Sequence, residues 1–321
     1  MEKFVRFNLI KFLASFFIIC ITSSTGISQT VFEAGISVGP SNFLGDLGGR
    51  LGKGRPFIKD NNFKMTRLLA GFYVTAQPND YIGIRFAANF GRLEGADSII
   101  NDKGGWETAR KNRNLHFRSP LTEAYLAFEV YPLVFLEEDP SDVWHKWRPY
   151  GLIGVGVFHF NPKSVYTDPS GNQTWVDLKP LRTEGQGMPN YPTRKEYNLT
   201  QLNIPYGIGI KYFLSERINI SLELVNRKTF TDYIDDVSTK FIDPADFYNY
   251  FGASSVTAQI AEQVSNRAST TNRNDYQPGA QRGTTTNNDA YYATTIKLGY
   301  RFGADGSSRF TNQTRCPVMR F

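Results

Sequence analysis

Charged residues of both signs recur at alternate positions within stretches that are otherwise apolar. Arg85, Glu129, Glu223 and Lys297 are the clearest, and three further residues follow the same pattern: Glu33, Lys211 and Arg301. Charges on an enclosed face must be paired, because removing one partner of a buried ion pair costs about 3–5 kcal/mol. We therefore expect Arg85 to pair with Glu129, and Glu223 to pair with Lys297 or Lys211. A proton or ion path is the alternative use of such a set.

Two acidic motifs offer a different chemistry. Asp46 stands in SNFLGDLGG (41–49), and three aspartates stand in TFTDYIDDVS (229–238): Asp232, Asp235 and Asp236. Three carboxylates within five residues are candidate calcium ligands. Their spacing differs from that of known calcium loops, so hydrogen bonds to loop backbone amides are the favoured interpretation. The glycines of 41–49 are not followed by the Lys-Ser/Thr of a phosphate loop. We predict no metal and no cofactor.

Residues for acid–base or nucleophilic catalysis are sparse. The three histidines, His116, His145 and His159, are far apart in the sequence. His159 with Ser164 could imitate the lipid-facing hydrolase site that some small barrels use on lipid A, but no third member can be placed. A histidine or tyrosine at a membrane interface is more often an anchor. We predict a protein that is not an enzyme.

The elements that must position these side chains are eight stretches with a period of two, the pattern of strands with one apolar face. They cover about 31–43, 67–77, 81–95, 121–133, 147–160, 203–214, 217–233 and 290–303. In the last stretch one face is apolar, with aromatic residues near both ends: Tyr292, Thr294, Ile296, Leu298, Tyr300 and Phe302. The opposite face is small or charged. A lipid-facing strand around a narrow lumen has this pattern.

Connection lengths distinguish a membrane barrel from a soluble β-sandwich. Long connections follow the first, third, fifth and seventh stretches, at about 44–66, 96–120, 161–202 and 234–289. The others are short or moderate, as in a barrel with an external and a periplasmic end, whereas compact soluble domains rarely carry several long structureless loops. We predict an all-β, antiparallel, up-and-down transmembrane barrel of about eight strands. Loop 234–289 is polar, and we expect much of it to be mobile.

A barrel of eight strands is just wide enough to be filled by its own side chains. The opposed charges of the inward face fit such a plug, so we expect no conducting pore. The even strand number places both termini in the periplasm. No run of 18 apolar residues follows the N-terminal region, which excludes a helical membrane protein.

The N-terminus predicts export. Lys3, Arg6 and Lys11 precede an apolar stretch, and Gly26-Ile27-Ser28 offers a small-residue cleavage site, the pattern of a signal peptide over 1–28. The alternative is an uncleaved N-terminal anchor. The barrel then covers 29–303 and a periplasmic tail covers 304–321. The net charge of +6 is spread along the chain and predicts no nucleic-acid partner.

Cys316 is the one cysteine left after cleavage at residue 28, so no intramolecular disulfide is possible. It lies in a basic tail, and its neighbour Pro317 disfavours a helical conformation there. Disulfides persist in an oxidising periplasm, and nearby arginines lower the pKa of a thiol and favour exchange. A disulfide to a periplasmic partner and a free thiol are the two interpretations.

Four segments resemble the PorG family, the outer-membrane barrel of the type IX secretion system of Bacteroidota. They are FEAGISVGPSNFLGDLGG (32–49), RPYGLIGVGVFHFNP (148–162), IPYGIGIKYFLSERINISLELVNRKTFTDYIDDVS (204–238) and YYATTIKLGYRF (291–302). The resemblance implies a non-enzymatic barrel among outer-membrane lipids that anchors the periplasmic ring of the lipoprotein PorK with PorN, and that supports protein export and gliding. It makes the ring lipoprotein the expected partner of Cys316. A lipid A-modifying enzyme and an adhesin-type barrel acting through loops 161–202 and 234–289 are the alternatives.

Overall fold

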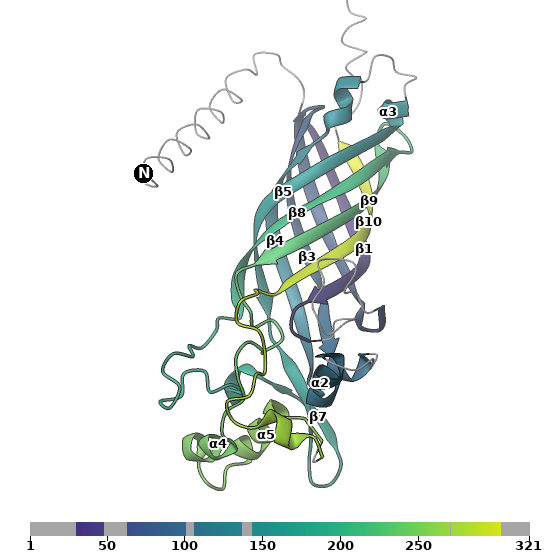
Figure 1. The fold of residues 1–321 in the computed structure, drawn as a ribbon. Helices are drawn as coiled ribbons and strands as arrows, with labels where there is room; N and C mark the ends of the chain where they lie inside the picture. The colour runs from purple at the N-terminus through teal and green to yellow at the C-terminus, as the bar shows by residue number, and fades with distance from the viewer. Residues whose placement is uncertain (1–29, 48–62, 101–105, 137–142, 270, 303–321) are drawn as a thin grey trace, which may run out of the picture.

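The chain folds into a closed barrel of eight long antiparallel strands (Figure 1). The computed structural model describes residues 30–47, 63–100, 106–136, 143–269 and 271–302. The barrel strands are Val31–Leu44 (β1), Arg67–Asn79 (β2), Ile82–Ala96 (β3), His116–Val130 (β4), Trp147–Phe160 (β5), Thr200–Phe213 (β8), Ile218–Thr229 (β9) and Ala290–Phe302 (β10). Each pairs with the next along the chain, and β10 pairs with β1, which closes the barrel. The predicted fold class is confirmed.

The largest differences from the expected strand boundaries are at the start of β4 and the end of β9. β4 begins at His116 rather than at residue 121, and its first residues continue the ladder with β3. Pro120 lies within this extension, and β5 pairs with β4 only from Leu121 onward. Proline is tolerated where one side of a strand is open. At its far end β9 stops at Thr229, four residues before the expected boundary.

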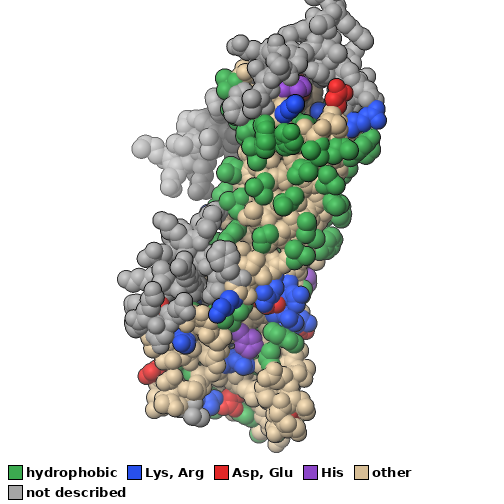
Figure 2. Space-filling view, turned by 90° about the vertical axis from the view of Figure 1, so that its right-hand side faces the viewer, with side chains coloured by type: hydrophobic (Ala, Val, Ile, Leu, Met, Phe, Trp, Pro, Cys, Tyr) green, Lys and Arg blue, Asp and Glu red, His purple; other side chains and the backbone are tan. Residues whose placement is uncertain are grey.

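The outer face of the barrel is a band of exposed hydrophobic side chains. On β9, for example, Ile218, Ile220 and Leu222 are 39%, 40% and 51% exposed, whereas the residues between them are buried. Figure 2 shows this band on one face of the barrel, with charged side chains toward both of its ends. A surface of this kind faces lipid. Tyr292 is the exception among the predicted lipid-facing residues, because it lies near the end of the strand and is buried.

The two ends of the barrel differ. At the turn end, short connections join β2 to β3 and β8 to β9, and a moderate one joins β4 to β5. This last connection contains the 3-10 helix Pro132–Leu136 (η4) and the helix Val143–Lys146 (α3). The first residue of β1 and the last of β10 also lie at this end, since Phe32 pairs with Phe302. The long connections meet at the opposite end, here called the loop end.

The loop connections fold into a cap at the loop end (Figure 1). Its elements are Phe63–Met65 (η2), Asp97–Ile99 (η3), Trp106–Arg113 (α2), Lys163–Thr167 (β6), Gln173–Asp177 (β7), Lys179–Leu181 (η5), Pro244–Phe251 (α4), Val256–Ser265 (α5) and Arg273–Tyr276 (η6). None of the helices in the described residues is long and apolar enough to cross a membrane.

The long loops 161–202 and 234–289 contain regular elements, although we expected much of loop 234–289 to be mobile. Both loops contribute to one small hydrophobic cluster, in which Leu178 and Leu181 from loop 161–202 lie with Phe247 and Val264 from loop 234–289. Neither loop carries enough apolar residues to suggest a core by itself. Together they bury one, and this stabilises the hairpin β6–β7 and the pair of helices α4 and α5.

Lipid exposure of the band makes a depth-dependent prediction. Leu222→Arg places a charge near the middle of β9, where we expect a loss of about 2–4 kcal/mol in the free energy of unfolding measured by denaturant titration in lipid bilayers. Ile218→Arg, on the same face at the end of the strand, serves as control and should lose about 0–1 kcal/mol. Equal losses at the two positions would contradict a lipid-facing band.

Candidate functional site

The middle of the lumen is filled by a network of charged side chains. Glu223 on β9 is its centre: Oε2 accepts hydrogen bonds from Arg85 Nη1, from Lys297 Nζ at 3.2 Å and from Tyr150 Oη at 2.7 Å. Arg85 Nη2 also contacts Glu129 Oε1 on the neighbouring strand. All five side chains are buried. Arg85 on β3 and Glu223 on β9 belong to opposite walls, because four steps separate these strands in either direction around the barrel.

A second ion pair crosses the lumen beside the first. Lys211 Nζ on β8 donates to Glu33 Oε2 on β1 at 2.8 Å, and Tyr73 Oη donates to Glu33 Oε1 at 2.8 Å. The Tyr73 ring in turn lies 3.8 Å from Lys297 Nζ, measured to the ring centroid. Of the two partners expected for Glu223, the structure places Lys297 there, and it places Lys211 against Glu33.

Glu123 on β4 forms a further polar layer. Both of its carboxylate oxygens accept hydrogen bonds from Arg227, each at 3.2 Å. Asn89, Asn203 and Tyr291 donate to the same carboxylate at 2.8–2.9 Å. The carboxylate is thereby saturated by donors from four strands. Such a buried charge is stable only because each lone pair has a partner.

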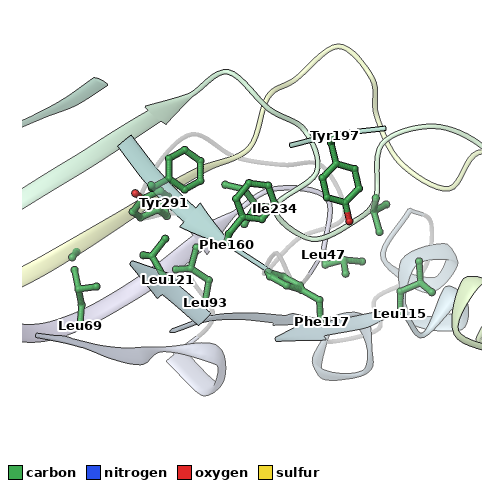
Figure 3. Close-up of a cluster of buried hydrophobic side chains, with 13 residues drawn as sticks. Leu47, Leu69, Leu93, Leu115, Phe117, Leu121, Phe160, Tyr197, Ile234 and Tyr291 are labelled. Carbon is green, nitrogen blue, oxygen red and sulfur yellow. The ribbon is translucent and has the colours of Figure 1, made fainter. Parts of the chain in front are cut away.

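A hydrophobic cluster closes the barrel toward the loop end (Figure 3). Leu69, Leu93 and Leu121 come from the barrel wall, whereas Leu47 and Ile234 come from the loops above it. Each of these side chains is at most 3% exposed. Charged layers and an apolar layer therefore occupy the lumen along the described residues. The arrangement can hold the walls of the barrel together.

Aspartate side chains hold the loops of the cap together above this hydrophobic cluster by accepting hydrogen bonds from backbone amides. Asp235 Oδ2 accepts a hydrogen bond from the Leu47 amide at 3.2 Å, and Asp46 Oδ2 accepts one from the Thr284 amide at 2.6 Å. Asp289 Oδ2 accepts one from the Ile234 amide at 2.8 Å. These contacts link loops far apart in the sequence. The favoured interpretation of the acidic motifs, hydrogen bonding to loop amides, describes Asp46 and Asp235.

Asp236 belongs to a separate group. Its carboxylate accepts hydrogen bonds from Thr183 and, at 2.7 Å, from Tyr197 Oη. Nearby, Arg282 Nη1 donates to Glu184 Oε1 at 2.9 Å, and both side chains are buried. Glu184 also accepts from the amides of residues 238 and 239, each at 2.9 Å. This group links loop 234–289 to loop 161–202.

The carboxylates under the cap outnumber their cationic partners, and their pKa values rise. Burial raises the pKa of Asp232 to about 8, and the charges of Asp46 and Glu184 add to the rise. Burial raises the pKa of Asp236 to about 6, although Arg282 opposes the shift. Burial and the neighbouring carboxylates also raise the pKa of Asp235 and Asp289 well above the ordinary value. The crowding of buried carboxylates under the cap therefore favours proton binding.

These carboxylates do not form a metal site. Among the residues that the structure describes, no three histidine, cysteine, aspartate or glutamate side chains are arranged to hold a metal ion. Asp235 and Asp236, though adjacent in sequence, serve different partners. The left-handed conformation of Asp236, with φ of 63°, separates their side chains.

The histidine and serine considered for a hydrolase do not converge. His159 is exposed on β5, and its Nδ1 lies 3.0 Å from Thr200 Oγ1. Ser164 lies instead beside His116, with Oγ 3.3 Å from Nε2. The same Nε2 accepts a hydrogen bond from the Val165 amide at 3.1 Å, and the Ser164 hydroxyl donates to the His116 carbonyl. His116 thus fastens the hairpin β6–β7 to β4, and its nitrogen is occupied.

Several predictions for the chain ends concern residues outside the described ranges. They are the signal peptide 1–28, the tail 304–321 and Cys316. Conversely, sequence reasoning missed Glu123, Glu184, Arg282 and Asp289. The inward parity of Glu123, six residues before Glu129 on one strand, was the available signal. The other three lie outside the eight stretches in which a period of two was recognised.

Comparison with known proteins gives distant structural neighbours and no relative in sequence. No protein-family model matches the chain, and no curated protein matches its sequence. A major outer membrane protein of Thermus thermophilus is 15% identical, with 85% of this chain and 99% of that chain covered and a TM-score of 0.35. Ail, the attachment invasion locus protein of Yersinia pestis, is 10% identical. The match covers 84% of this chain and 99% of that chain, with a TM-score of 0.34. The N-terminal barrel domain of Pseudomonas aeruginosa OprF is 9% identical, with 86% of this chain and 98% of that chain covered and a TM-score of 0.32.

At these identities the likeness concerns the fold alone. The strand pairing and the hydrophobic band of the chain itself carry the assignment to a closed eight-stranded barrel of the outer-membrane type. The families of these structures differ from one another, so they lend the chain no activity.

The lumen network makes a stability prediction. Glu223→Ala removes the acceptor shared by Arg85, Lys297 and Tyr150, and leaves a buried ammonium without its carboxylate. We expect the free energy of unfolding to fall by about 3 kcal/mol, seen as a lower temperature of the heat-modifiable gel shift. Glu216→Ala, in the exposed turn between β8 and β9, is the control and should leave it unchanged. Two equally silent variants would contradict the network.

The cap carboxylates make a pH prediction. A carboxyl whose folded pKa is raised stabilises the fold below its unfolded pKa of about 4, and this contribution is lost as pH rises through the folded value, about 8 for Asp232. Amide exchange of residues 231–239, corrected for intrinsic rate, should therefore show more opening at pH 9 than at pH 5. Asp232→Asn should reduce this difference, with strands β8 and β9 as internal control. Protection that rises with pH would contradict the prediction.

Proposed function

We propose that this chain is a non-enzymatic outer-membrane anchor of a protein secretion system, and that it is not itself the conduit. The filled lumen is the observation that carries the proposal. Glu223 and Arg85 join opposite walls, and the cluster around Leu121 closes the mouth. A barrel without a passage contributes by holding a position in the membrane and by presenting its ends to partners.

The turn end suits the periplasmic side. Outer-membrane barrels have short turns toward the periplasm and long loops outside. In that orientation both ends of the barrel sequence, Val31 and Phe302, lead into the periplasm, as does the connection between β4 and β5. At this end Phe135 and Leu136 on η4 are 70% and 58% exposed, and Phe135 stacks on Tyr81. These exposed side chains form a contact surface on the side where a periplasmic ring would lie.

The type IX secretion system is proposed on the resemblance to the PorG family, with the PorK/PorN ring as partner. Within the motifs that carry this resemblance, Asp46 and Asp235 hold the cap, and Glu223 holds the lumen. These structural roles support a fold shared with the PorG family, and they carry less information about a shared partner. The partner therefore needs a direct test.

Affinity purification from gently solubilised membranes tests the partner. The wild-type chain should retain a periplasmic lipoprotein and its ring partner, identified by mass spectrometry. Phe135→Ser combined with Leu136→Ser should weaken this retention, because it removes the apolar contact at the turn end. Val256→Ser, at a position 62% exposed in the cap, is the matched control. Retention of no periplasmic protein, or equal loss in the control, would exclude the proposed anchor.

Cys316 supplies a separate test of the tether. Native membranes, alkylated during lysis and separated without reductant, should show a heavier band that contains this chain. The band should disappear on reduction and in Cys316→Ser, because no other cysteine follows the signal peptide. A wild-type chain that runs as a monomer alone would exclude a covalent tether.

A further inference from the structure

The cap contains a polar pocket at the end of the molecule farthest from the turns. It lies between α4, α5, the end of β6 and the segment that follows α5, with a volume of about 410 Å³. Figure 1 places α4 and α5 beyond the barrel mouth. The pocket is independent of the lumen and of the turn end, so it goes beyond the proposed anchoring function.

The walls of this pocket are held in place by hydrogen bonds. The Gln263 side chain bonds the backbone of Thr167 on both sides: Nε2 donates to its carbonyl at 3.0 Å, and Oε1 accepts from its amide at 2.9 Å. Tyr248 Oη donates to Glu262 Oε2 at 2.8 Å. Asn266 Nδ2 donates to the Tyr276 carbonyl at 3.0 Å. The pocket is thus preformed, which reduces the entropic cost of binding.

Arg267 gives the pocket an uncompensated positive charge. Its Nη1 donates to the Val165 carbonyl at 2.6 Å, and its Nε is buried without a hydrogen-bond partner. Among the described residues, no carboxylate lies within ion-pair distance of this half-buried guanidinium. Burial accordingly lowers the pKa of Arg267, with no acidic neighbour to offset it. A sheltered guanidinium in this state favours an anion from outside.

The remaining charges set the size of that anion. Arg273 Nη2 lies 3.5 Å from Glu262 Oε1, a loose contact, and its side chain is 43% exposed. Two guanidinium groups and one carboxylate leave a single positive charge, which matches a monoanion better than a dianionic phosphate. The other polar groups, such as the Gln259 amide and the Thr167 hydroxyl, suit a ligand rich in hydroxyl groups.

We propose that this pocket binds a hydroxylated monocarboxylate of the size of a sugar acid, with the carboxylate between Arg267 and Arg273. The volume falls within the range of small-molecule sites. The Tyr248 ring supplies an apolar wall beside the polar groups, as sugar rings require. Free uronic acids and uronic acid units of a glycan share this chemistry.

Isothermal titration of the purified full chain in detergent with sodium glucuronate tests the proposal. Glucuronate should bind, and glucose, which lacks the carboxylate, should bind at least tenfold more weakly. Arg267→Gln should weaken glucuronate binding at least tenfold and leave the heat-modifiable gel shift unchanged. Arg92→Gln, an exposed arginine on the barrel wall, is the control and should bind as wild type.

Two further ligands complete the test. Methyl glucuronide imitates a glycan-linked unit: its binding assigns a glycan, whereas binding of free glucuronate alone assigns a free sugar acid. Glucose 6-phosphate binding in preference to glucuronate would overturn the assignment of a monocarboxylate. Absence of glucuronate binding, or binding that survives Arg267→Gln and Arg273→Gln together, would overturn the site.

Discussion

An ion pair between opposite walls of the barrel is the interaction on which the rest of the structure depends. Arg85 and Glu223 stand on strands four steps apart around the barrel, and they meet because eight strands enclose a narrow lumen. A shift of one residue in the register of either strand would turn its charge toward lipid. The network therefore specifies strand register as well as filling the lumen. The hydrophobic band outside and the charged layers inside both follow from the alternation of apolar and polar side chains along each strand.

The cap follows different electrostatics from the lumen. Inside the barrel each carboxylate faces a guanidinium or an ammonium, as Glu123 faces Arg227 and Glu33 faces Lys211. Under the cap, Asp235 and Asp289 accept hydrogen bonds from backbone amides and lie near other carboxylates. Burial and this repulsion raise the pKa of both carboxyls. The barrel and its cap are thus stabilised by different means, and we expect the cap to be the part that responds to pH.

The sequence predicted the barrel because alternation reports which face a side chain occupies. Arg85 and Glu129 were paired correctly because they stand on consecutive strands, where the register limits the choice. Alternation does not report which residues meet across the lumen, so the contact between Lys211 and Glu33 was missed. In the loops no period exists: Glu184 and Arg282 lie 98 residues apart, and only the folded cap brings them together. The weakly apolar loops concealed a core that neither forms alone.

We propose that a barrel filled in this way holds a position in the membrane and offers its ends to partners. We infer from the filled lumen that no ion path crosses the barrel. Planar-bilayer recording of the purified full-length protein is the test. We expect a baseline without stable channel openings, and also without openings in Val256→Ser, which alters the cap surface alone. Stable, large, reproducible open-channel currents from the wild-type protein would contradict it.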